Sequence, residues 1–127
     1  MEKEIDRTVR KAEAGARFFQ TQAVFDVGVF ETFMKKVGHL KVSFLAGIIL
    51  LKSGNMARNL NASLPGVHVP EALILEMDEA ENKAQKSVEI AARTIREVRG
   101  MCQGVHIMAI GWERRIPEVL RAAGLAA

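Results

Sequence analysis

The chain has 127 residues, of which 49% are hydrophobic and 26% are charged, a balance typical of a soluble globular domain. Its net charge of +3 comes from charges mixed along the sequence, and the lack of a lysine- or arginine-rich tract argues against nucleic-acid binding. The single cysteine, Cys102, excludes an internal disulfide, and the longest apolar run, residues 42–51, is too short to span a membrane. The charged start MEKEIDRTVRK is unlike a signal peptide, so we expect a cytoplasmic protein.

Helical and extended patterns follow one another along the chain. The first helix is indicated by the stripe Ile5, Val9 and Ala12, and Asp26 and Ser53 are expected to cap the second and third helices. Helices are predicted over residues 2–14, 26–37, 53 to 60 or 64, 70–77, 79–99 and 113–123. Short, continuously apolar runs predict buried strands at about 16–22, 41–49 and 104–110. The inner face of the second helix is expected to consist of Val29, Phe30, Phe33, Met34 and Val37.

This alternation predicts an α/β fold with a parallel sheet. Three strands that are covered on both faces close no barrel, and they leave two long apolar edges without a partner. We therefore expect the chain to belong to a larger assembly.

The stretch FFQTQAVFD, residues 18–26, places two glutamines in a run built for burial. A buried amide needs hydrogen-bond partners or costs about 1–3 kcal/mol. Gln20 and Gln22 are therefore either satisfied structural amides or part of a polar site. Their spacing in an extended strand predicts that both point to the same face.

Three runs carry a resemblance to a known family. KAEAGARFFQTQAVFD (11–26), VSFLAGIILLKSGNMARNL (42–60) and GVHIMAIGWE (104–113) together resemble the C-terminal part of methylenetetrahydrofolate reductase. That family is an eight-stranded β/α barrel that holds FAD, takes NAD(P)H as reductant and reduces methylenetetrahydrofolate. The resemblance implies a partial (β/α)8 TIM barrel in which residues 1–127 form one segment, from the helix before the sixth strand to the helix after the eighth.

The resemblance also implies roles for individual residues. Gln22 matches the family glutamine that orients the folate-type substrate, while Gln20 is expected to line the barrel interior. Arg10 and Lys11 match a basic pair that contacts the flavin phosphates. Composition alone favours the alternative, in which both residues belong to a solvated helix face, and the resemblance brings the two interpretations of Lys11 to equal weight.

Three further positions depart from the family pattern. Met56 and Leu60 stand where well-studied members have a glutamine and an aromatic residue for folate, and Trp112 stands where they have an arginine. All three are candidates for substrate binding. The alternatives are that Met56 and Leu60 belong to the core and that Trp112 anchors the start of the last helix.

No catalytic acid and no metal site are expected in this segment. The family's proposed proton donor lies on earlier strands, and Cys102 and His106 would stand about 13 Å apart in a strand. The primary hypothesis is the C-terminal portion of a flavin-dependent reductase that is inactive without the N-terminal barrel part, with the rest of the barrel as its partner. The alternative is a non-catalytic homo-oligomer that serves as a scaffold or binds flavin or pterin. A pterin-dependent methyltransferase is disfavoured by the T-Q and G-I signatures.

Overall fold

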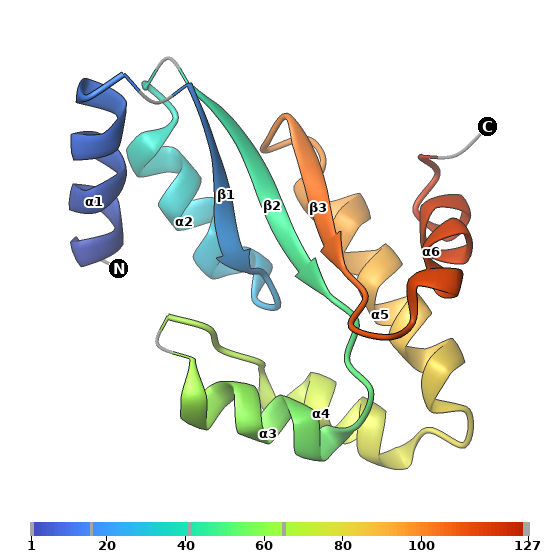
Figure 1. Cartoon of the computed structure of the whole chain (residues 1–127). Coiled ribbons are helices and arrows are strands. Elements are labelled where there is room, and N and C mark those ends of the chain that lie inside the picture. Colours follow the sequence, from blue (N-terminus) through green and yellow to red (C-terminus); the bar gives the residue numbers. More distant parts are fainter. Residues whose placement is uncertain (1, 16, 41, 65, 126–127) are drawn as a thin grey trace.

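A computed structural model describes residues 2–15, 17–40, 42–64 and 66–125. In this part of the chain, three parallel strands form one sheet in the order β1-β2-β3 (Figure 1). The strands are β1 (Phe18–Ala23), β2 (Ser43–Ile49) and β3 (Gly104–Met108). The predicted α/β class, with parallel strands separated by helices, is confirmed, and the arrangement is that of part of a TIM-type barrel.

Six α-helices are described in the same ranges. They are α1 (Glu2–Glu13), α2 (Val27–Val37), α3 (Gly54–Ser63), α4 (Glu71–Glu79), α5 (Lys83–Val98) and α6 (Ile116–Ala122), the last preceded by a 3-10 turn, η1 (Glu113–Arg115). The predicted caps are confirmed, because the Asp26 side chain accepts a hydrogen bond from the Val29 amide and Ser53 accepts one from the Met56 amide. None of these helices is both long and apolar enough to cross a bilayer.

Some predicted boundaries differ from the structure. The helix expected at 79–99 begins at Lys83, because Asn82 caps it by accepting a hydrogen bond from the Gln85 amide. The strand expected at 104–110 ends at Met108, since Ile110 has a φ of 47°, outside the strand region. Of the predicted strand starts, Ala16 and Lys41 lie outside the described residues.

The sheet is covered on one face and at one end. Helices α2 and α5 pack against each other and lie on one face, while α3 and α4 lie across the carboxyl ends of the strands (Figure 1). The core beneath α5 includes Ile48, Leu50 and Ile95, and the core beneath α3 and α4 includes Leu51 and Met77. The layer of α3 and α4 therefore lies over the carboxyl ends of the strands, which is the end at which barrel enzymes have their active sites.

The opposite face of the sheet is open to solvent. Gln20 and His106 are exposed there, and Phe18 on the same face keeps 63% of its surface accessible. Phe18 stands at the start of β1 and gives this face an exposed aromatic side chain.

Strand β1 carries a bulge opposite Gly47. Gln20 pairs with Leu45, but Ala23 instead of Gln22 pairs with Gly47, so β1 has one extra residue between these rows. The Gly47 amide donates to the Thr21 hydroxyl at 3.1 Å, and the Val24 amide donates to the Gly47 carbonyl at 2.8 Å. A Cβ at position 47 would lie only 2.7 Å from the Thr21 carbonyl oxygen. Only glycine allows the two strands to approach this closely.

Replacing Gly47 tests this contact. Gly47→Ala should lower the free energy of unfolding by about 2 kcal/mol, because backbone atoms of β1 must move to admit the methyl group. Gly100→Ala is the matched control, since a Cβ there meets nothing within 4 Å. Urea unfolding of both variants measures the difference, and equal stabilities would contradict the close approach.

Candidate functional site

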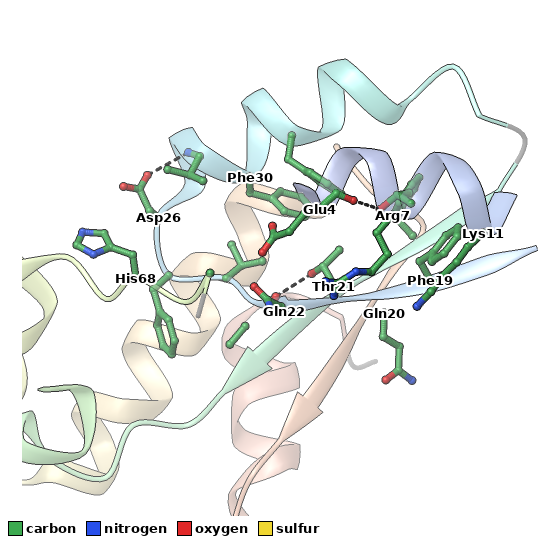
Figure 2. A pocket seen from close by; sticks show the side chains of 18 residues that line it. Glu4, Arg7, Lys11, Phe19, Gln20, Thr21, Gln22, Asp26, Phe30 and His68 are labelled. Atoms are coloured by element: carbon green, nitrogen blue, oxygen red, sulfur yellow. Dashed lines mark hydrogen bonds between the residues drawn. The ribbon is translucent and has the colours of Figure 1, made fainter. Parts of the chain in front are cut away.

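A cavity of about 220 Å³ lies between α1 and β1 and extends to the carboxyl end of that strand (Figure 2). Its walls come from α1, from β1, from the first turns of α2 and from the loop that contains Gly66 and His68. The cavity exists because α1 packs mainly against α2 and stands apart from the strand (Figure 1). A second hollow along α1, of about 260 Å³, is lined by Lys3, Asp6, Arg7 and Arg10.

Aromatic rings form the apolar wall of this cavity. Phe19 of β1 stacks on Phe44 of β2 with ring centroids 5.7 Å apart, and Phe33 of α2 meets Phe44 edge-on at 6.2 Å. Phe30 is buried beside them. Val29, expected on the inner face of α2, is instead 49% exposed because it lines the cavity, so that part of the prediction is wrong.

Polar side chains line the opposite wall. Helix α1 contributes Glu4, Arg7 and Lys11, which are spaced so that they share one face of the helix. Thr8, the most buried residue described in α1, donates its hydroxyl proton to the Glu4 carbonyl at 2.8 Å. An apolar wall opposite two cations and a carboxylate is suited to a flat, aromatic ligand with charged or polar edges.

Gln22 reaches this cavity from the end of β1. A Cβ at Gly66 would collide with the Gln22 Oε1 and with a carboxylate oxygen of Glu4, so these two groups meet beside Gly66. Gln20 also lines the cavity, but its side chain extends away from α1 (Figure 2). The expectation that the two glutamines share a face is therefore wrong, and the bulge opposite Gly47 is the reason.

Met56 and Leu60 lie away from this cavity. Both are partly buried against the core that includes Leu51 and Met77, and the Met56 sulfur accepts a hydrogen bond from the Lys52 amide at 3.3 Å. This placement supports the alternative in which they serve packing.

Trp112 lies at the turn after β3. It packs against the core that includes Ile48 and Leu50, and the Lys52 ammonium sits 5.6 Å from the centre of its ring. Backbone amides of Glu113 and Gly111 hold the pKa of the Glu113 carboxyl below its usual value, with a smaller contribution from Lys52. Lys52 and Trp112 therefore form a cation–π pair near the carboxyl end of β3, and neither residue lines the cavity.

Comparison with known protein families identifies the family of this chain. The family model described as methylenetetrahydrofolate reductase matches residues 1–124, nearly the whole chain. The chain belongs to the methylenetetrahydrofolate reductase family. A search of curated proteins finds no significant match. Membership in the methylenetetrahydrofolate reductase family implies a folate-related oxidoreductase and a folate-type substrate.

The basic pair expected to contact flavin phosphates lines two adjoining hollows. Lys11 lines the cavity beside Phe19, Arg10 lines the second hollow with Lys3 and Asp6, and Arg7 lines both. Both lie in the last turn of α1, which leads into the amino end of β1. The assignment of Arg10 and Lys11 to the flavin phosphates stays a prediction.

Glu4 and Gly66 were not singled out from the sequence. In the sequence, Glu4 is one of several charged residues of alternating sign in a helix expected to be solvated. Its position near the end of β1 results from the packing of α1 on α2. The Pro-Gly pair at 65–66 predicts a turn, which was the available signal for Gly66.

Within the described ranges, no group of three histidine, cysteine, aspartate or glutamate residues is arranged to hold a metal ion.

Proposed function

We propose that this chain is the C-terminal part of a flavin-dependent reductase that converts methylenetetrahydrofolate, or a related pterin, to its methyl form. The observation that carries the proposal is the position of Gln22 at the carboxyl end of β1, beside a cavity with an aromatic wall, in a chain of this family. Carboxyl ends of strands are where barrel enzymes bind their substrates.

Gln22 would orient the substrate. Its amide offers two N–H donors and one carbonyl acceptor, so it matches a pterin edge that carries both a ring carbonyl and a ring N–H. Because an amide has no charge, it fixes the orientation of the ring without altering the charge balance of the reaction. FAD, when bound in the complete barrel, supplies the hydride chemistry. The cations Arg7 and Lys11 would attract the acidic tail of a folate-type molecule.

Completion of the barrel is part of the proposal. In the described sheet, β1 and β3 each pair with β2 alone, so each has one edge that pairs with no other described strand. Unpaired edges and an open face that carries Phe18 are best satisfied by further barrel strands. Such strands would also supply further flavin contacts, and the proton donor that we assign to no residue of this chain.

The role of Gln22 can be tested by removal of its side-chain amide. Gln22→Leu should weaken binding of methyltetrahydrofolate about tenfold, because a hydrogen-bonding edge of the ligand loses its partner. Gln85→Leu is the matched control, since Gln85 is exposed on α5 and does not line the cavity. Calorimetric titration measures both affinities, and equal losses in the two variants would contradict the assignment.

The partial-barrel assignment has its own test. The 127-residue chain purified alone should carry no stoichiometric flavin and should associate or melt with low cooperativity, because its sheet edges are unsatisfied. Flavin absorbance and sedimentation velocity measure these properties. Tight FAD binding by the chain alone would refute the proposal, and a discrete homodimer that melts cooperatively would favour the non-catalytic oligomer instead.

A further inference from the structure

One side chain of α3 holds the segment that leads into α4. The Oδ1 atom of Asn61 accepts a hydrogen bond from the Val69 amide at 2.7 Å, and its Nδ2 atom donates to the Val69 carbonyl at 3.1 Å. A single side chain thus bonds both backbone groups of one residue, as a neighbouring strand would. Because Val69 is only 1% exposed, these backbone groups have little access to water and depend on Asn61 for their partners.

The segment held in this way alternates between the core and the cavity. Val67 and Val69 are buried in the core beneath α3 and α4, whereas Gly66 and His68 are exposed and line the cavity. Burial that changes from residue to residue is typical of an extended chain, and a shift by one residue would exchange the two sets. The hydrogen bonds to Val69 therefore fix which residues of the segment form a wall of the cavity.

Gly66 connects this segment to the end of β1. Its φ of 84° allows the chain to turn, and the Val67 amide closes the turn on the Leu64 carbonyl at 3.2 Å. A Cβ at position 66 would collide with the Gln22 Oε1, so the Gly66 backbone limits where the Gln22 amide can lie. Displacement of the segment would therefore change the space beside that amide.

We propose that Asn61 is a positioning residue for the substrate site. It does not line the cavity, and it acts through Val69 and Gly66 on the room available to the Gln22 side chain. This inference rests on the proposed function, in which Gln22 orients the folate-type substrate. It assigns to an exposed residue of α3 an effect on substrate affinity that no contact with the substrate produces.

The test measures protection of the segment and ligand affinity in the same variants of the 127-residue chain. Asn61→Ala should raise hydrogen exchange at Val69 about tenfold, because that N–H loses its acceptor. It should also weaken binding of methyltetrahydrofolate about three- to fivefold, because Gly66 no longer keeps its place beside Gln22. Mass spectrometry of the peptide that contains Val67 and Val69 measures the exchange, and calorimetric titration measures the affinity.

Two further variants are matched controls. Asn59→Ala removes the same amide from an exposed position of α3 that does not line the cavity. Val119→Ala removes buried volume from a core cluster that contains no cavity-lining residue, so it lowers stability without altering the segment before α4. Both variants should bind methyltetrahydrofolate as tightly as the wild-type chain does.

Three results would overturn the inference. Unchanged exchange at Val69 in Asn61→Ala would show that the segment does not depend on this side chain. Faster exchange with unchanged affinity would mean that Asn61 serves the loop alone, and an equal loss of affinity in Val119→Ala would attribute the effect to stability. Failure of the proposed function looks different, because the wild-type chain itself would then bind no methyltetrahydrofolate, and the inference would fall with it.

Discussion

The close approach of β1 to β2 at Gly47 is the constraint on which the candidate site depends. The Thr21 carbonyl lies where a side chain at position 47 would stand, and this contact accompanies the extra residue of the β1 bulge. Beyond the bulge the strand faces are exchanged, so Ala23 joins the core under α3 and α4 while Gln22 turns toward α1. Without the bulge, the two glutamines of β1 would share the open face of the sheet. One glycine in the central strand thereby determines which of the two amides turns toward α1.

The cavity itself results from an imbalance in the packing of α1. This helix has a cationic and acidic surface, and its apolar stripe of Ile5, Val9 and Ala12 is only half-buried. The stripe finds contacts with α2, and the side that faces β1 is left with charged residues opposite phenylalanine rings. Burial of charged groups against aromatic rings is unfavourable when they have no partner. Helix α1 therefore does not pack closely on β1, and the cavity lies between them. In this sense the hollow follows from the sequence of α1 and not from the sheet.

Elements with strong local signals were predicted well from the sequence. The caps Asp26 and Ser53 and the alternation of helices with apolar strands each depend on residues that are close together in the chain. Boundaries were less accurate where a competing local feature decided them, as with the Asn82 cap of α5 and the left-handed conformation of Ile110. Gln22 was singled out through a family resemblance, whereas Glu4 became visible only through tertiary packing. No pattern in a single strand reveals a bulge that depends on the strand beside it, which is why the faces of Gln20 and Gln22 were assigned wrongly.

The open face of the sheet has a thermodynamic consequence. In the proposed barrel, Phe18 and the unpaired edges of the described strands would contact other polypeptide, so the folding free energy of this segment would include the free energy of that contact. By mass action, its melting temperature would then depend on how much of the remaining barrel is present. Substitutions on the open face would therefore alter stability in the proposed barrel while leaving the isolated segment almost unchanged, and the two measurements would rank the same variants differently.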